Sequence, residues 1–278
     1  MLRRFLDLIA DQGGLARTIR KSLRAPGHAA TSLARVLKRD YVKLLFDSPR
    51  TWQHYRRELA ESGFLTDRLR ALQARFATLE SSAVRGHKVV PGQIRTLHAE
   101  ILYALVRHRR PAVVVETGVC NGLSTAVILQ AMSLNDCGKL HSVDLPEFTD
   151  PALNVQEFWK GKAGAAVPAG SRPGWLVEGA LADRWSLSLG RSQEVLPRVL
   201  GEMQSAVDVF IHDSEHSYEN QLFEFGLGYS ALSPGGLLVA TDINWSRAFE
   251  DFWSSIREQN ARRAYVDAGC AVVRKGIQ

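Results

Sequence analysis

The residues best suited to chemistry form a segment rich in acids and histidines, FIHDSEHSYE, at positions 210–219. His212 and His216 flank Asp213, and a further carboxylate, Asp242, follows a later apolar run. An imidazole with a pKa near neutrality can take a proton from a hydroxyl, whereas carboxylates stay anionic and can hold a cation or orient a ligand. We therefore predict His216 as a general base, assisted by Asp213. The alternative for each of these residues is a purely structural hydrogen bond.

A second segment, ETGVCNGLST at positions 116–125, follows a run of three valines. Gly118 and Gly122 would let a ligand approach the backbone where a Cβ would block it. Their spacing, G-x-x-x-G, differs from the G-x-G-x-x-G of dinucleotide-binding turns. Asp144 follows the next apolar run, where a carboxylate can accept hydrogen bonds from both hydroxyls of a ribose. A plain strand-to-helix turn and a surface aspartate are the alternatives.

Regular elements must position these residues, and from Pro111 onward short apolar runs alternate with helical segments. We expect strands at residues 113–115, 140–143, 185–189, 207–211 and 237–240. Helices are expected at residues 122–132, 192–203, 217–232 and 247–258, with a turn at 233–236. A final antiparallel hairpin is predicted from residues 264–266 and 270–273.

This alternation predicts an α/β fold with a doubly wound, mostly parallel sheet of seven strands, helices on both faces, and one antiparallel strand contributed by the terminal hairpin. Ligands of such sheets bind beyond the carboxyl ends of the strands, near the point where the strand order switches. The loops at that edge comprise residues 116–122, 144, 190–193, 212–216 and 241–245. Both chemical segments therefore belong to one predicted site.

The chain before this domain looks different. Residues 1–90 show helical spacing and no strand signal, so we predict a helical N-terminal extension (1–90) and a second domain (91–278). The extension is expected to pack over the cofactor cleft or to build a dimer contact. Residues 145–180 are irregular, as functional loops are. Three tryptophans are candidates for lining an apolar acceptor pocket: Trp159, Trp175 and Trp245.

Together, the turn at 116–125 and the acid at 144 resemble the class I S-adenosylmethionine (SAM)-dependent methyltransferases. Four further segments are similar to motifs of that family: 175–185, 190–200, 210–219 and 233–245. The resemblance covers about residues 93–275. It extends to the subgroup of macrocin O-methyltransferase and the cephalosporin-biosynthesis methyltransferases, and it implies a Rossmann-like methyltransferase fold.

The resemblance also implies where SAM binds and what reaction follows. In the family, the first turn carries the methionine moiety, the acid after the second strand holds the ribose, and the third-strand turn borders the adenine. The residues assigned to the cofactor in this way are Glu116, Gly118, Gly122, Ser124, Asp144, Ser192, Gln193 and Asp213. The implied activity is O-methylation of a small sugar, polyol or natural-product acceptor.

A divalent cation such as Mg²⁺ is a further expectation. Metal-dependent O-methyltransferases that resemble this chain place an aspartate after the fourth strand and two ligands after the fifth. There the ion binds the acceptor's oxygens and lowers the pKa of the attacking hydroxyl. Asp213 and Asp242 match by position, but the next residue is Ile243, which cannot ligate, and Asn244 lies one residue further on. Metal binding by the two aspartates and mere loop organisation both stay open.

The composition is that of an ordinary globular protein. The 278 residues are 45% hydrophobic and 23% charged. No apolar run approaches the roughly 20 residues that cross a bilayer. Three cysteines without metal-ligand spacing favour a reducing, cytoplasmic setting over a disulfide framework. The first 14 residues are expected to form an amphipathic helix and not a signal peptide.

Charge is unevenly distributed, with a balance of +13 over residues 1–110 and −7 over residues 111–278. The basic part would suit phosphate, anionic lipid or nucleic acid, but it also suits packing against an acidic domain. Nothing in it resembles an RNA-binding motif, so we expect a small-molecule acceptor and no nucleic acid. A homo-oligomer stays open. The alternative function is a non-catalytic cofactor-binding or scaffold protein on the same fold, because fold does not determine function.

The ribose assignment leads to the first prediction. Asp144→Ala should weaken SAM binding, because it removes an acceptor for two ribose hydroxyls, and hydrogen bonds to a charged group contribute about 1.5–3 kcal/mol each. Calorimetric titration of the folded variant with SAM measures the loss. An unchanged affinity would refute the ribose role of Asp144, and binding of NADH instead of SAM would refute the family assignment.

Overall fold

A seven-stranded sheet forms the centre of the computed structural model, which describes residues 40–77, 79, 83–84, 87–88, 91–154, 158, 166–203 and 206–277. In chain order its strands are β3 (Val113–Thr117), β4 (Lys139–Asp144), β7 (Trp185–Leu189), β8 (Val207–His212), β9 (Leu232–Ala240), β10 (Arg262–Tyr265) and β11 (Ala271–Arg274). They lie in the order β10-β11-β9-β8-β3-β4-β7. Neighbours from β9 to β7 pair in parallel, and β11 runs antiparallel between β9 and β10. The predicted fold class is confirmed.

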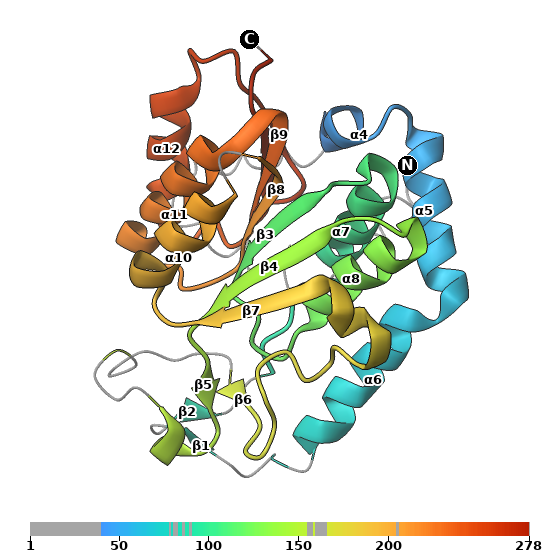
Figure 1. Cartoon of the computed structure of the whole chain (residues 1–278), viewed down its shortest axis with the longest axis vertical. Helices are drawn as coiled ribbons and strands as arrows, with labels where there is room; N and C mark the ends of the chain where they lie inside the picture. The colour runs from blue at the N-terminus through green and yellow to red at the C-terminus, as the bar shows by residue number, and fades with distance from the viewer. Residues whose placement is uncertain are drawn as a thin grey trace, which may run out of the picture.

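Helices cover both faces of this sheet (Figure 1). One face carries α10 (Ser192–Glu202), α11 (Tyr218–Ala231) and α12 (Ala248–Ile256). The other carries α7 (Thr96–Arg109) and α8 (Leu123–Asn135). Successive residues of the central strand serve opposite faces, since Val114 belongs to the core on the α7 side and Val115 to the core on the α11 side. This period of two is the pattern of a strand buried on both sides.

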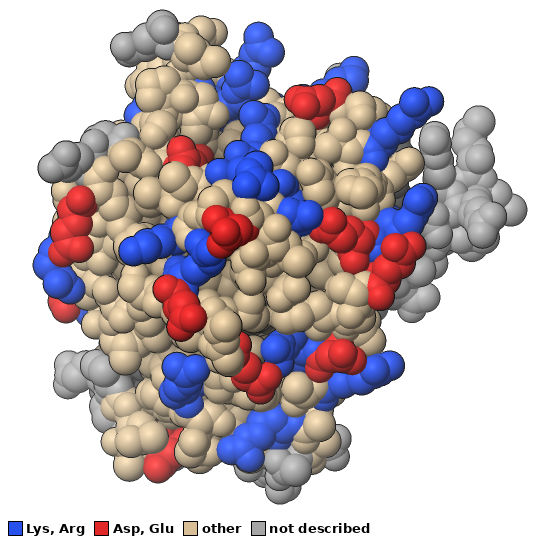
Figure 2. Space-filling view, turned by 45° about the vertical axis from the view of Figure 1, so that its right-hand side comes forward, with Lys and Arg blue, Asp and Glu red and all other residues tan. Residues whose placement is uncertain are grey.

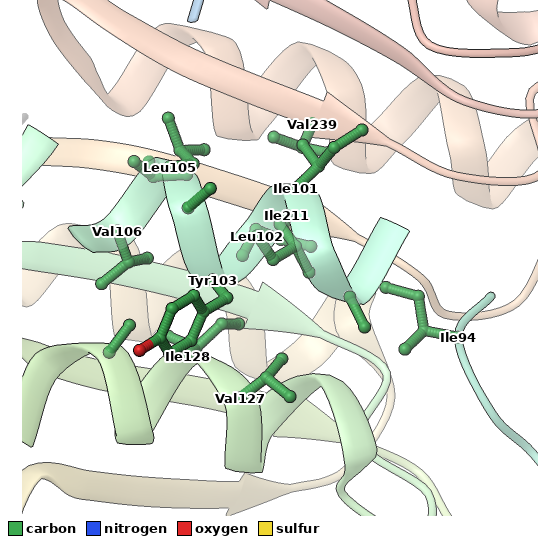
Figure 3. Packing of buried hydrophobic residues seen from close by; sticks show 14 of the residues in the cluster. Ile94, Ile101, Leu102, Tyr103, Leu105, Val106, Val127, Ile128, Ile211 and Val239 are labelled. Carbon is green, nitrogen blue, oxygen red and sulfur yellow. The ribbon is translucent and has the colours of Figure 1, made fainter. Parts of the chain in front are cut away.

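Helix α7 packs against the sheet and against the neighbouring helix α8, as Figure 3 shows. Its buried residues Ile101, Leu102 and Leu105 lie in the same cluster as Ile211 of β8, and each of the four is at most 1% exposed. Helix α7 therefore contributes to the main hydrophobic core and packs on the strands that lead to the candidate site.

The helical N-terminal extension is present in its described part as α4 (Asp40–Leu45), α5 (Pro49–Ser62) and α6 (Phe64–Ala77). Gly63, in the left-handed region with φ of 70°, ends α5 and separates it from α6. Helices α5 and α6 form an outer layer over α7 and α8, whereas α4 packs against β10 (Figure 1). Glu58 of α5 fastens the layer, because it accepts hydrogen bonds from Tyr103 (2.6 Å) and Arg107 (2.7 Å) of α7. Residues 1–39 lie outside the described part.

Two local expectations were wrong. Residues 1–90 contain two very short paired strands, β1 (Ala83–Val84) and β2 (His87–Lys88), whose two-residue length leaves no periodicity to detect. The Ser-Pro-Gly-Gly segment at 233–236 is not a turn after the helix but the first part of β9, where a register shift occurs against β8. Such an irregularity accommodates proline and glycine inside a strand.

The segment between β4 and β7 forms a small lobe beyond the carboxyl ends of the strands (Figure 1). The lobe contains a parallel pair, β5 (Glu147–Phe148) and β6 (Ala166–Val167), and the 3-10 helix η1 (Pro151–Leu153). The chain then returns to the other end of the sheet, where the 3-10 helix η2 (Gly179–Arg184) packs on α8 and leads into β7. Among the residues that the structure describes, no helix is both long enough and apolar enough to cross a membrane.

The shared core leads to a prediction about Leu72 of α6, which is fully buried in the same cluster as α7 and α8. Leu72→Ala should lower the free energy of unfolding by about 2–5 kcal/mol, because it leaves a cavity in the main core. Urea denaturation followed by circular dichroism should show one transition shifted as a whole. Leu134→Ala, at a side chain that is half exposed, is the control and should change stability by less than about 0.5 kcal/mol. Two separate transitions in Leu72→Ala would show that the extension is an independent unit.

Candidate active site

The carboxyl ends of β3, β4, β8 and β9 are tied together by backbone hydrogen bonds that continue past the strands. Gly118 donates to the carbonyl of Val143 at 2.9 Å, and Asp213 donates to the carbonyl of Thr117 at 2.9 Å. Thr241 donates to the carbonyl of His212 at 3.0 Å. The loops that follow these strands are thereby held at one edge, which is where ligands of this kind of sheet bind.

Three of the predicted residues meet at this edge. His216 Nε2 lies 3.1 Å from Asp242 Oδ2, and Asp213 lies close enough that one ligand atom from each of the three residues falls within 4.8 Å of the others. The Thr241 hydroxyl donates a hydrogen bond to Asp213. The structure thus gathers His216, Asp213 and Asp242 into one cluster, which we call the acidic-histidine cluster.

Electrostatics in the cluster favour an imidazolium-carboxylate pair. Burial alone would lower the pKa of His216, but its bond to Asp242 and the nearby charge of Asp213 raise that pKa above the ordinary value. Burial would raise the pKa of Asp242, yet the same bond to His216 lowers it. Asp213 has a raised pKa because it is desolvated. In the described part of the chain His216 Nδ1 is buried and has no hydrogen-bond partner, so one ring nitrogen remains for another interaction.

The second histidine of the motif has a different environment. His212 is fully buried at the end of β8, and its Nδ1 lies 2.6 Å from the carboxylate of Glu224 on α11. Glu224 also accepts hydrogen bonds from Thr117 and from Ser214 (2.8 Å). Of the two histidines, the structure therefore places His216, and not His212, in contact with the cluster carboxylates.

Glu224 itself was not anticipated from the sequence. It is fully buried, and its pKa is lowered despite the cost of burial, because His212 and the surrounding hydroxyls favour the ionised form. Asn220, one helical turn earlier, donates to it at 3.1 Å. The sequence does hold one indication of this pair: Asn220 and Glu224 are polar, are four residues apart, and lie on the buried side of α11.

A second supporting group comes from outside the predicted motifs. Asp267, in the turn between β10 and β11, accepts hydrogen bonds from Arg95 (2.7 Å) and pairs with His98 Nε2 (2.8 Å), at the start of α7. Its other oxygen accepts from the Gly269 amide, and the Gly269 carbonyl accepts from the amide of Ile243 at 3.1 Å. The loop that carries Asp242 is thus held by the first turn of α7.

The first turn of the domain rests on an internal carboxylate. Glu116 is fully buried and accepts hydrogen bonds from Ser124 (2.6 Å), Thr125 (2.8 Å) and Ser142 (2.9 Å). Burial raises the pKa of Glu116 to about 7. Glu116 and Ser124, two residues expected to bind the cofactor, are therefore hydrogen-bonded to each other under the turn.

The two glycines of the turn have left-handed backbones, with φ of 86° at both Gly118 and Gly122. A Cβ on Gly118 would come within 2.1 Å of the Asp213 carbonyl oxygen. A Cβ on Gly122 would come within 2.7 Å of the Gly174 Cα. The protein's own backbone thus occupies the space that a side chain would need, which is one reason for glycine at both positions. The approach of a ligand to this turn stays a prediction.

Asp144 lies beside this turn. Its carboxylate accepts hydrogen bonds from the amides of Val119 (3.1 Å) and Cys120 (3.3 Å), so it fastens the turn between the first two strands. Burial raises its pKa to about 6. Two carboxylate oxygens offer about four acceptor positions, so the same group has capacity for hydroxyls as well.

The residues expected near the adenine lie at the start of α10. Gln193 is exposed and donates to Asn220 Oδ1 at 2.7 Å, and the Ser192 hydroxyl bonds to Glu224. The two side chains link α10 to α11 in this structure, and their role toward a cofactor stays a prediction.

The three tryptophans expected to line an acceptor pocket differ in their surroundings. Trp245 is 63% exposed, and its ring centroid lies 5.3 Å from that of His216, so it borders the acidic-histidine cluster. Trp175 instead packs against the main core and donates to Asn121 at 2.7 Å. Trp159 lies outside the described residues.

The donor set of the cluster fits a divalent cation. Two carboxylates and an imidazole converge, and both are ligand types that transition metals accept, whereas Mg²⁺ prefers oxygen. Ile243 is buried at 8% exposure in the core on the α11 side and takes no part. Because His216 Nε2 is shared with Asp242, a cation using that nitrogen would displace a proton.

Comparison with known proteins agrees with this architecture. Residues 115–243 match a family model described as a methyltransferase domain, Methyltransf_24. The match begins in β3 and ends one residue after Asp242, so it includes the first turn, Asp144 and the whole acidic-histidine cluster. The match lies within the domain predicted at residues 91–278, whose bounds stay a prediction.

A solved structure shows the same fold. An O-methyltransferase from Bacillus cereus in complex with SAH is 15% identical, with 82% of this chain and 99% of that chain covered and a TM-score of 0.50. Cofactor-bound Rv0187 from MTB is 14% identical, with 76% and 91% covered and a TM-score of 0.49. The predicted Rossmann-like methyltransferase fold is confirmed. The domain match and the fold together support a SAM-dependent methyltransferase.

One curated protein is also similar. It is a CTP synthase from Granulibacter bethesdensis (strain ATCC BAA-1260 / CGDNIH1), 29% identical over 161 residues. The alignment covers 54% of this chain, and this chain spans only 27% of that protein's length.

The raised pKa of Glu116 makes the stability of the folded chain depend on pH. Its pKa is raised from 4.5 to about 7, so ionisation costs stability in the folded state, and that cost grows as the pH rises from about 4.5 through 7. Glu116→Gln stays neutral and escapes this loss. The melting temperature of the variant minus that of the wild type should therefore be more positive at pH 8 than at pH 5.

Differential scanning calorimetry across this range measures the effect. Glu61→Gln, at an exposed glutamate of α5, is the control for removing a carboxylate. A difference for Glu116→Gln that is flat with pH would contradict the raised pKa.

Proposed function

We propose that this chain is a SAM-dependent O-methyltransferase that acts on a hydroxyl of a small sugar, polyol or natural-product acceptor. The observation that carries the proposal is the acidic-histidine cluster. The cluster holds an imidazole and two carboxylates within the segment that matches a methyltransferase domain, and Asp213 lies against Gly118 of the first turn. Solved relatives of the same fold include an O-methyltransferase in complex with SAH. The resemblance to the macrocin and cephalosporin-biosynthesis subgroup favours a sugar or natural product over a macromolecule.

The proposed cofactor site is the region beside the first turn. SAM, when bound, supplies a methyl group on a positively charged sulfur. Asp144 is proposed to accept the ribose hydroxyls while it keeps its bonds to the Val119 and Cys120 amides. Glu116 is proposed to act indirectly, without touching the cofactor, by holding Ser124 and the start of α8 in place. Because the turn is fixed before any ligand arrives, binding would need little reorganisation.

His216 is proposed to take the proton from the acceptor hydroxyl. Its Nε2 faces Asp242, a carboxylate that can only accept, so the neutral ring carries its hydrogen on Nε2 and has a lone pair on Nδ1. Nδ1 has no hydrogen-bond partner among the described residues and is therefore the basic atom. Asp242 would stabilise the imidazolium that forms, as the carboxylate of a catalytic triad does. Positioning would supply most of the rate.

Asp213 and Asp242 are proposed either to hold a divalent cation or to orient the acceptor directly. A cation, when bound, would lower the pKa of the acceptor hydroxyl. In both versions Thr241, which donates to Asp213, and the Gly269–Ile243 bond keep the two carboxylates in place. The exposed face of Trp245 is proposed to form one wall of the acceptor site. Cytoplasmic location and a small-molecule partner belong to the same proposal.

The catalytic assignment is tested with His216→Ala. With an acceptor found by measuring SAH release over a panel of phenols and sugars, the variant should lose about 10²–10⁴-fold in kcat, the usual contribution of a general base. Its affinity for SAM, measured by calorimetry, should stay unchanged. His141→Ala is the matched control, because His141 lies on β4, which β3 separates from β8, and it hydrogen-bonds Ser186, away from the cluster.

Removal of divalent cations by EDTA distinguishes a cluster that holds a cation from one that orients the acceptor directly. If EDTA leaves the wild-type rate intact, His216 acts without metal. If EDTA abolishes the rate and Mg²⁺ restores it, the carboxylates hold a cation. Near wild-type turnover in both His216→Ala and Asp213→Ala would show that the catalytic centre lies elsewhere.

A further inference from the structure

Two arginines face each other in the terminal hairpin. Arg262 of β10 and Arg274 of β11 are direct register partners in the antiparallel ladder, so their side chains project from the same face of the sheet. Like charges directly opposite one another destabilise a strand pair, whereas opposite charges stabilise it. The hairpin therefore carries an unfavourable pair at a position where one acidic residue would have produced a favourable one.

Neither arginine is neutralised by the part of the chain that the structure describes, where neither forms an ion pair or a hydrogen bond. Both line two adjoining hollows, of about 130 Å³ and about 400 Å³. Lys43 of α4 adds a third positive charge to the larger one. Arg263, also in its lining, is already paired with Glu250 at 3.0 Å. Asp40 is the sole acidic residue in either lining.

The charge of Arg274 also affects a neighbouring arginine. The pKa of Arg109, at the end of α7, is lowered by burial and by the charge of Arg274. Figure 2 shows that basic and acidic side chains alternate over much of one face, with the basic ones gathered in its upper part. The lining of the two hollows differs from this mixed pattern, because Asp40 is its sole acidic residue.

This hollow is separate from the candidate active site. Arg274 pairs with Leu237, in the first part of the parallel strand segment of β9, while Asp242 follows the carboxyl end of the same strand. The arginine pair lies at the amino-terminal side of the sheet, so its ligand would be neither SAM nor the methyl acceptor.

Protection of a sheet edge explains only part of the pattern. Charged residues on an edge strand discourage pairing with other chains, and β10 is an edge strand. Arg274, however, lies on β11, which is paired on both sides. Its charge does not protect an edge, and it adds to the repulsion at Arg262.

We propose that the Arg262–Arg274 pair and Lys43 form a binding site for a phosphate group. Guanidinium groups present planar sets of donors that match phosphate oxygens, and a doubly charged anion would convert the repulsion between the arginines into two attractions. Apolar side chains in the larger hollow, among them Leu44 and Trp253, would contact the remainder of a phosphate-bearing ligand. The site would take a small phosphorylated molecule or a phosphate headgroup at a lipid surface.

The test uses the full chain without SAM or acceptor, so its result does not depend on the proposed methyl transfer. Binding of inorganic pyrophosphate is measured by calorimetry and by the shift in melting temperature, against sodium chloride at equal ionic strength. The wild type should bind pyrophosphate and melt at a higher temperature with it than with chloride. Vesicles of phosphatidylcholine with and without phosphatidic acid test the lipid source in a co-sedimentation arm.

Arg262→Glu is the decisive variant, because it places a carboxylate opposite Arg274. Without pyrophosphate it should melt at a higher temperature than the wild type, and its pyrophosphate affinity should fall at least tenfold. Arg198→Glu, at an exposed arginine of α10, changes the net charge equally and should leave the affinity unchanged. Arg274→Gln serves if Arg262→Glu fails to fold, with the same expected loss.

Loss of either the pyrophosphate or the phosphatidic acid response in Arg262→Glu, with retention in Arg198→Glu, supports the proposal and identifies the source. A wild type that responds to neither probe beyond chloride overturns it. An equal response in Arg262→Glu and the wild type overturns it as well.

Discussion

The fully buried carboxylate of Glu224 is the interaction on which the candidate site depends. An ionised group without water is very unfavourable unless hydrogen bonds and opposite charge compensate for its lost hydration. Here the compensation comes from three directions: Thr117 at the end of β3, His212 at the end of β8, and Ser214 in the loop that follows. Because these donors must all point at one carboxylate, the ends of two strands and the start of α11 have a single arrangement, and Asp213 and His216 lie in the loop between them.

The same constraint explains the glycine at 118. When the β8 loop is drawn against the end of β3, the Asp213 carbonyl occupies the position of a Cβ at residue 118. A second buried carboxylate, Glu116, organises the other side of β3 through Ser124 and Ser142. The central strand is thus flanked at its end by two buried carboxylates, one serving the first turn and one serving the acidic-histidine cluster. Hydrogen bonds that converge on buried carboxylates hold the strand ends in one arrangement, and a site held in this way suits a reaction that depends on alignment.

Segments outside the methyltransferase domain match also support this site. The match begins at residue 115, yet Arg95 and His98 at the start of α7 hold Asp267, and through Gly269 they hold the loop of Asp242. The outer helices are bound to α7 by Glu58 and share its hydrophobic core. Helices therefore lie on both sides of the boundary expected at residue 90, and the packing continues across it.

The sequence by itself determined the alternation of strands and helices, the parallel sheet with its terminal hairpin, and the edge at which Asp213, His216 and Asp242 meet. These follow from local periodicity and from the rule that the carboxyl ends of parallel strands share one edge. Only the tertiary structure decided which polar residue does what. Glu224 and Thr117 are 107 positions apart, and Asp267 and His98 are 169 apart, so no local pattern links them. Periodicity reports which face of an element is buried, but a hydrogen-bond partner is chosen by where the whole chain brings each group. For that reason His212 and His216, four residues apart in one motif, have entirely different partners.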